Sequence, residues 1–224
     1  MGEIARACGE AQLTTGMRDR KRIIWGMLRV SPATRRYTEL SLQQLAVFEA
    51  QTVIEIPITT ERLTIRRFEA KDLEPLLRFM LDDDSTRFLT FDAEQKTEPG
   101  ATALFEYVLQ DYASREPVYS YAVVERETDE YVGSCGYAPY EDGIVECYYA
   151  VNAEHRGKGI ATEAAKALIQ ALASTPEVRE IRAYCHAENS AAHDVALQSG
   201  MTAKGLAMHK DSSLESQLFA RITG

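Results

Sequence analysis

The chain has 224 residues, of which 45% are hydrophobic and 26% charged, and its formal net charge is −9. This composition is typical of a globular protein in water and excludes a disordered chain, a collagen and a coiled-coil rod. No apolar run approaches the roughly 18 residues that a membrane span requires. The acidic balance also disfavours nucleic acid and anionic lipid as partners. Because residues 1–30 lack the apolar segment of a signal peptide, we expect a cytoplasmic protein with neither membrane nor nucleic-acid partners.

The N-terminal extension, residues 1–57, differs in charge from the rest of the chain. Its first 36 residues contain eight basic and three acidic side chains, so they carry +5 and leave −14 for the remainder. A disordered tail, a basic arm that docks on the acidic domain, a transit peptide, and a later start at Met17 or Met27 are all compatible with this composition. We favour a tail or a later start, and we predict one short amphipathic helix over residues 38–50.

Regular patterns of apolar residues predict one domain over residues 58–224. Alternation indicates strands, and apolar spacings of three to four residues indicate helices. Short polar turns join three successive strands, which predicts an antiparallel meander. In chain order we expect strand 62–68, a helix capped by Asp72, helix 104–112, strands 119–125, 131–137 and 144–151, helix 157–174, strand 181–186, a helix from Asn189 to Gly200, and two strands within 202–222. The fold class is therefore α+β (mixed α/β), with a single mixed, largely antiparallel sheet flanked by helices.

Cysteine and histidine spacing gives no sign of a metal site. The four cysteines show no CxxC pattern and the histidines are scattered, so no pair has the spacing of metal ligands. Three of the cysteines fall in apolar, strand-like runs, where a thiol behaves as a small hydrophobic group. We therefore predict no bound metal, and reduced, buried thiols at Cys135, Cys147 and Cys185.

The segment that follows the third strand of the meander carries the clearest chemical signal. It contains Arg156, Gly157, Lys158 and Gly159, immediately before a helix. Glycines let a ligand approach the backbone, and the first turn of a helix offers N–H groups without internal partners at the positive end of its dipole. This combination predicts a pyrophosphate cradle. The segment is neither a P-loop nor a Rossmann fingerprint, because GxxxxGK[ST] is absent and Thr162 stands where the third glycine would be.

Residues 156–161, with the sequence RGKGIA, fit the R/Q-x-x-G-x-G/A signature of the GNAT superfamily of acyl-CoA-dependent N-acetyltransferases. The surrounding residues 148–164 and the first strand at residues 60–66 resemble the RimJ/RimL branch, which acetylates protein N-termini. Asn189, which opens the next helix, resembles the second motif of that branch. The resemblance covers about three quarters of the chain and implies the GNAT-like acyl-CoA N-acyltransferase fold.

The resemblance also implies acetyl-CoA as co-substrate and an amine-bearing acceptor, such as a protein or peptide N-terminus or a small amine. The pantetheine arm is expected against the strand before the loop, and the pyrophosphate on the loop. The residues implied in acetyl-CoA binding are Tyr149, Ala150, Val151, Arg156, Gly157, Lys158, Gly159, Ile160, Ala161 and Asn189. We expect a monomer or a homodimer.

Transfer to an amine requires a group that accepts the amine proton, because an ammonium ion has no lone pair. Glu146 is our first candidate for this base, since it belongs to the strand against which the thioester should lie. Glu154, in the loop beside that strand, is the second. Glu163 is expected to be a solvated surface acid on the following helix.

The departing thiolate also needs a proton, and the usual donor is missing. Many GNAT enzymes place a tyrosine and a serine in the second-motif helix, but Ala196 and Ala192 occupy these positions here. Tyr148 is therefore our candidate acid, with Tyr149, Tyr184 or water as alternatives.

Two functions remain open from the sequence. The first is an N-acetyltransferase in which a primary amine attacks the thioester directly, and the negative charge of the domain would favour a cationic acceptor. The second is a non-catalytic acyl-CoA-binding sensor or interaction module of the same fold, which would not need the missing tyrosine and serine. Release of free thiol from acetyl-CoA in the presence of amines distinguishes the two.

Overall fold

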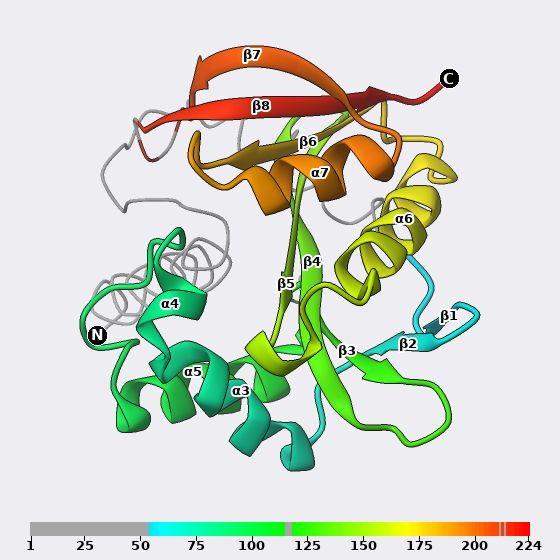
Figure 1. The fold of residues 1–224 in the computed structure, drawn as a ribbon. Coiled ribbons are helices and arrows are strands. Elements are labelled where there is room, and N and C mark those ends of the chain that lie inside the picture. Colours follow the sequence, from blue (N-terminus) through cyan, green and yellow to red (C-terminus); the bar gives the residue numbers. More distant parts are fainter. Residues whose placement is uncertain (1–53, 115–117, 211, 213) are drawn as a thin grey trace, which may run out of the picture.

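The computed structural model describes residues 54–224 apart from 115–117, 211 and 213. These residues form a mixed sheet of eight strands in the order β1-β2-β3-β4-β5-β6-β8-β7 (Figure 1). The strands are β1 (Ile58–Thr59), β2 (Leu63–Arg66), β3 (Ser120–Glu125), β4 (Tyr131–Glu141), β5 (Ile144–Val151), β6 (Glu180–Cys185), β7 (Thr202–Met208) and β8 (Glu215–Ile222). Neighbouring strands are antiparallel except β5 and β6, which are parallel. The predicted fold class is confirmed.

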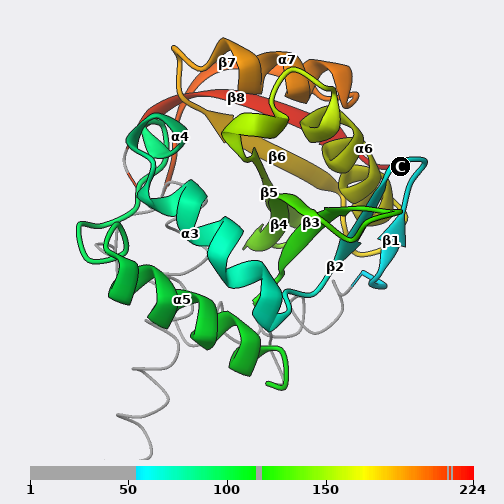
Figure 2. The same ribbon diagram turned by 60° about the horizontal axis from the view of Figure 1, so that its bottom comes forward.

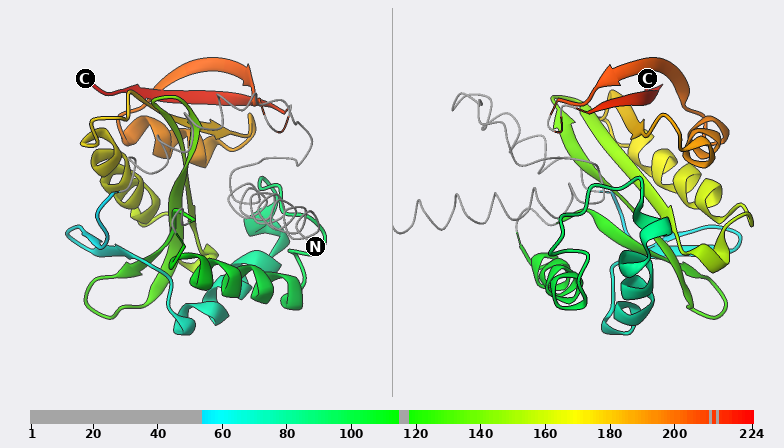
Figure 3. Two further views of the ribbon diagram at one scale, coloured as in Figure 1. Left: turned by 180° about the vertical axis from the view of Figure 1, so that it is seen from behind. Right: turned by 60° about the vertical axis from the view of Figure 1, so that its left-hand side comes forward.

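Helices cover both faces of this sheet (Figure 2). They are α3 (Leu73–Leu81), α4 (Asp83–Thr86), α5 (Glu98–Asp111), α6 (Ile160–Ala173) and α7 (Ser190–Gln198), with short 3-10 turns at Ala70–Asp72 and Ala153–His155. Helices α3 and α5 pack on one face, and α6 and α7 pack on the other (Figure 3). In α6, Ala164, Leu168 and Leu172 recur every fourth residue and are buried against the sheet. None of the described helices has the length and apolar character needed to cross a bilayer.

The predicted strands and helices are present with somewhat different bounds. Helix α6 begins at Ile160 rather than at residue 157, because Gly157 and Gly159 have φ values of +73° and +77°, outside the right-handed helical region. Two short elements, β1 and α4, were not predicted. The helix predicted over residues 38–50 lies outside the described residues.

Strands β5 and β6 separate at the centre of the sheet, as Figure 1 shows. They pair only at Ile144–Glu180, Val145–Ile181 and Glu146–Arg182, whereas β5 continues to pair with β4 as far as Val151. Beyond Glu146, the edge of β5 that faces away from β4 therefore has no strand partner within the described chain. Because β5 leads into the loop before α6, this opening and the glycine-rich loop are neighbours in the structure.

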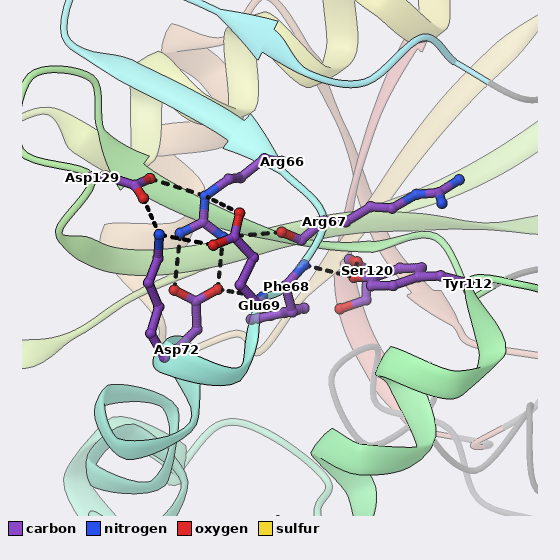
Figure 4. Close-up of polar contacts among 9 residues, drawn as sticks. Arg66, Arg67, Phe68, Glu69, Asp72, Tyr112, Ser120 and Asp129 are labelled. Carbon is purple, nitrogen blue, oxygen red and sulfur yellow. Dashed lines mark hydrogen bonds and ion pairs between the residues drawn. The ribbon is translucent and has the colours of Figure 1, made fainter.

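A cluster of hydrogen bonds and ion pairs around Arg66 joins β2 to the start of α3 (Figure 4). The Nη1 and Nη2 groups of Arg66 donate to the two carboxylate oxygens of Asp72 at 2.7 and 3.0 Å, and its Nε donates to Asp129 at 3.0 Å. Asp72 is only 1% exposed and also accepts from the backbone N–H of Glu69 at 2.8 Å. Asp72 is the N-cap residue of α3, as predicted, but its side chain makes no capping bond, because its oxygens bond to residues that precede the helix.

We expect Arg66→Lys to lower the free energy of unfolding by about 1–2 kcal/mol. A lysine ammonium cannot reproduce the two parallel hydrogen bonds to a buried carboxylate, and hydrogen bonds to charged groups contribute about 1.5–3 kcal/mol each. Urea unfolding measures the change. The matched control is Arg67→Lys, because Arg67 is exposed and faces the ring of Tyr112 at 5.2 Å. Equal losses in the two variants would contradict a special role for the Arg66–Asp72 pair.

Candidate active site

The loop before α6 presents a row of unpaired backbone amides. The N–H groups of residues 157–162 have no hydrogen-bond acceptor within the described chain, and the first bond back into the helix runs from Glu163 N to Gly159 O at 3.0 Å. A Cβ added at Gly157 would meet no heavy atom within 4 Å, so the space over the loop is open. These amides lie at the positive end of the α6 dipole, which favours an anion. The row fits the diphosphate of coenzyme A, whose oxygens only accept hydrogen bonds.

The two basic side chains of this loop, Arg156 and Lys158, have different surroundings. Arg156, predicted to face the phosphates, donates instead to Asp84 at 3.0 Å and to the hydroxyl of Ser85 at 2.6 Å. It therefore ties the loop to α4. Lys158 is exposed, and its carbonyl accepts a hydrogen bond from Arg62 at 3.0 Å. Of the two basic side chains, Arg156 is thus occupied by protein partners.

Glu163 is not the solvated surface acid that we predicted. Its carboxylate accepts hydrogen bonds from the hydroxyl of Thr60 at 2.6 Å, from Arg62 N at 3.0 Å and from Arg62 Nε at 2.6 Å. The side chain is 19% exposed. Partial burial alone would raise the pKa of this carboxyl, but the bonds from Thr60 and Arg62 lower the pKa below its ordinary value. Glu163 thereby fastens the turn between β1 and β2 to the first turn of α6.

We expect Glu163→Gln to lower the free energy of unfolding at pH 7 by about 1 kcal/mol. Since the pKa of Glu163 is lowered by folding, its contribution is present above the unfolded value of about 4.3 and is lost as the pH falls through the folded value. Wild type and variant should therefore converge between pH 7 and pH 3, as measured by urea unfolding at each pH. Glu106→Gln, at an exposed position of α5, is the control. A difference that persists at pH 3 would contradict this assignment.

A pocket of about 70 Å³ occupies the opening between β5 and β6. Its walls come from β5, β6, the start of α7 and the chain after α4. It brings together four of the predicted residues, Glu146, Tyr148, Tyr149 and Asn189. A larger pocket of about 400 Å³ lies elsewhere, between β2, β3 and the end of α5, and holds none of these four side chains. We therefore locate the candidate site at the smaller pocket.

Glu146 sits where the two strands part, and it is almost fully buried, at 3% exposed. Its Oε2 lies 2.8 Å from Nε2 of His209, which is 1% exposed. Sequence reasoning missed this histidine, because the two residues are 63 positions apart and no motif links them. The second candidate base, Glu154, is exposed on the 3-10 turn and, among the described residues, does not line the pocket.

The tyrosines of β5 point to opposite faces of the sheet. The hydroxyl of Tyr148 hydrogen-bonds with the hydroxyl of Ser120, whereas the hydroxyl of Tyr149 donates to Ala192 O, at the start of α7, at 2.9 Å. Burial raises the pKa of both phenols well above the ordinary value. Both phenols are therefore protonated at neutral pH.

Asn189 caps α7, and its Oδ1 accepts a hydrogen bond from Ala192 N at 3.2 Å. Ala196, at the position of the usual tyrosine, is fully buried in the core between α7 and the sheet. Cys135, Cys147 and Cys185 are buried thiols, as predicted. The part of the chain that the structure describes contains no group of three or more His, Cys, Asp or Glu side chains suited to a metal ion.

Comparison with known proteins decides the family. A family model described as "Acetyltransferase (GNAT) domain" matches residues 62–202, more than half of the chain. The chain is a member of the GNAT acetyltransferase family. This GNAT protein is 27% identical over 133 residues to the uncharacterized N-acetyltransferase p20 of Bacillus licheniformis, a match that covers 58% of this chain and 74% of the relative. Family membership and such relatives support N-acetyltransferase activity.

Solved GNAT structures share the same fold. An acetyltransferase of the GNAT family from Bacillus anthracis superposes with a TM-score of 0.62 at 23% identity, covering 75% of this chain and 99% of that one. RimL, a ribosomal L7/L12 α-N-protein acetyltransferase in complex with coenzyme A, superposes with a TM-score of 0.55 at 18% identity, covering 75% and 97%. A RimL structure among the neighbours supports the predicted resemblance to the RimJ/RimL branch.

Proposed function

We propose that this GNAT protein transfers an acetyl group from acetyl-CoA to a primary amine by direct attack of the amine on the thioester. One observation carries the proposal: six consecutive free amides at the start of α6 adjoin the opening between β5 and β6, and a buried carboxylate stands where that opening begins. The amides suit a diphosphate, the unpaired edge of β5 suits an amide-bearing arm, and the carboxylate suits an amine. These groups would serve coenzyme binding and acceptance of the amine proton.

Backbone groups would do most of the coenzyme binding. The amides of residues 157–161 would hold the diphosphate, with Arg156 and Lys158 at the margin of the loop. The unpaired edge of β5 at Tyr149, Ala150 and Val151 would bond to the pantetheine arm, and Asn189 borders the same pocket. Bound acetyl-CoA supplies an acetyl group activated as a thioester.

Protein side chains would then take part in two proton transfers. Glu146 would accept the proton of the attacking amine, because it is the carboxylate that lines the pocket. Glu154 is the second candidate, and it would act only through water because of its exposed position. Tyr148, which lines the same pocket, would give a proton to the leaving thiolate.

The acceptor is proposed to be a protein or peptide N-terminus, with a small amine as the other option. RimL, whose name specifies an α-N-protein acetyltransferase, shares this fold, which supports a protein N-terminus. The charge of −14 outside the first 36 residues would steer cationic acceptors toward the domain. Steering of this kind raises the association rate and weakens with salt.

Thiol release tests the proposal. The full chain is incubated with acetyl-CoA and a panel of peptides and linear amines, and free thiol is measured against hydrolysis without amine. We expect amine-dependent release together with a mass gain of one acetyl group on the acceptor. Coenzyme A binding by calorimetry without any amine-dependent release would instead support the non-catalytic binding module.

A further inference from the structure

His209, the residue after β7, is held in one orientation by bonds on both ring nitrogens. Its Nδ1 accepts from Ser212 N at 3.3 Å, so the ring proton belongs on Nε2. That Nε2–H donates to Oε2 of Glu146 at 2.8 Å. The backbone N–H of His209 also donates to Leu214 O at 2.9 Å, which fixes the residue in the hairpin between β7 and β8.

Aromatic rings enclose the imidazole on two sides. Tyr184 of β6 and Tyr140 of β4 meet it edge-on, with ring centroids 4.7 and 5.3 Å away. The two phenols bond to each other at 3.2 Å, and Tyr140 also accepts from the backbone N–H of Lys210 at 3.2 Å. Because these two rings belong to β4 and β6, the imidazole cannot turn without displacing them. Its N–H therefore has a fixed direction.

Within the described residues, the pocket between β5 and β6 is lined by Glu146 but not by His209. The carboxylate thus stands between the pocket and the imidazole. From this arrangement we propose that His209 is a positioning residue for Glu146: its Nε2–H holds Oε2 and so orients the carboxylate toward an amine in the pocket. This inference rests on the proposed function.

The proton balance of this arrangement is simple. The amine proton passes to the carboxylate of Glu146, while His209 keeps its Nε2 proton and donates it to Oε2 before and after the transfer. A neutral donor that stays in place adds no second proton transfer, yet it fixes the geometry on which efficient proton transfer depends. A simpler role, satisfying a buried carboxylate for stability alone, predicts no effect on rate in a folded variant.

Other titratable and charged groups around the pair must be considered for any pH effect. They are the phenols of Tyr140 and Tyr184, the thiol of Cys147 beside Glu146, and two cations above the ring of Tyr140, Lys210 at 3.9 Å and Arg182 at 5.4 Å. Arg182 is paired with Glu180 at 2.8 Å. Arg182 is also the register partner of Glu146 on β6. The variants below change only the bond from His209 to Oε2 of Glu146.

The test compares His209→Gln with His209→Asn in the full chain. The amide of glutamine reaches the position of Nε2 and can still donate to Glu146, whereas the amide of asparagine is too short. With the best acceptor of the amine panel, we expect kcat of the asparagine variant to fall about 10–100-fold and that of the glutamine variant to stay within about 5-fold. Calorimetric affinity for coenzyme A should stay within 2-fold in both. The apparent pKa of kcat/KM should rise in the asparagine variant, because the charged carboxylate loses a hydrogen bond.

A readout independent of turnover accompanies the kinetics. In ¹⁵N NMR of the imidazoles, wild type should show a neutral His209 protonated on Nε2, and Glu146→Gln should shift that signal. Equal kcat in wild type and both His209 variants, while Glu146→Gln is impaired, would overturn the positioning role but leave the proposed function intact. Absence of turnover by wild type with every amine would overturn both.

Discussion

Glu146→Gln is expected to slow acetyl transfer by about 10²–10⁴-fold, the range that positioned general bases contribute. Glutamine keeps the volume of the side chain and can still accept a hydrogen bond from Nε2 of His209, but it cannot take a proton. Because the diphosphate and the pantetheine arm are assigned to backbone groups, affinity for coenzyme A should change less than 2-fold. Steady-state thiol release and calorimetric titration with coenzyme A measure the two quantities.

Glu154→Gln is the matched control for the base. Glu154 lies eight positions further along the chain but is exposed, and we expect its variant to retain turnover within about 3-fold. A large loss at Glu154 with none at Glu146 would reverse the order of the two candidates. Unchanged turnover in both variants would remove the carboxylate base from the mechanism.

Replacement of Gly159 by valine should weaken coenzyme A binding about 100-fold or more. Gly159 has φ of +77°, a conformation that a β-branched residue adopts at a cost of about 1–3 kcal/mol. The new side chain would also stand within the row of free amides, where it would hinder the approach of a diphosphate. Loss of one or two hydrogen bonds to a charged group, about 1.5–3 kcal/mol each, accounts for the size of the effect.

Gly200→Val separates strain from binding. Gly200 follows α7 and has φ of +85°, and its added Cβ would meet no heavy atom within 4 Å, whereas a Cβ at Gly159 would lie 3.5 Å from Nη2 of Arg62, an ordinary van der Waals contact. Both variants should therefore lose similar stability in urea, but only Gly159→Val should lose calorimetric affinity. Wild-type affinity in folded Gly159→Val would disprove the amide row as the diphosphate site.

The loop and the base differ in how far local sequence could predict them. The amide row depends on two glycines and on the start of one helix, all within residues 156–162, so a motif of six letters was enough to locate it. Glu146 was a candidate because its strand precedes the loop, but its burial beside His209 was not predictable. The contacts of Arg156 with Asp84 and Ser85 could not be predicted, because they join residues more than 70 positions apart.

The sequence by itself determined the order of strands and helices, the mixed sheet and the glycine-rich loop before α6, because apolar periodicity and glycine conformation act between residues close in the chain. Only the tertiary structure decided which polar side chains meet. His209 reaches Glu146 across 63 positions, and Arg62 reaches Glu163 across 101. Such pairs form because a charged or polar group that becomes buried requires a hydrogen-bonding partner. The order of strands in the sheet decides which group lies near enough to be that partner. The order of residues along the chain does not show which of these side chains lie close together.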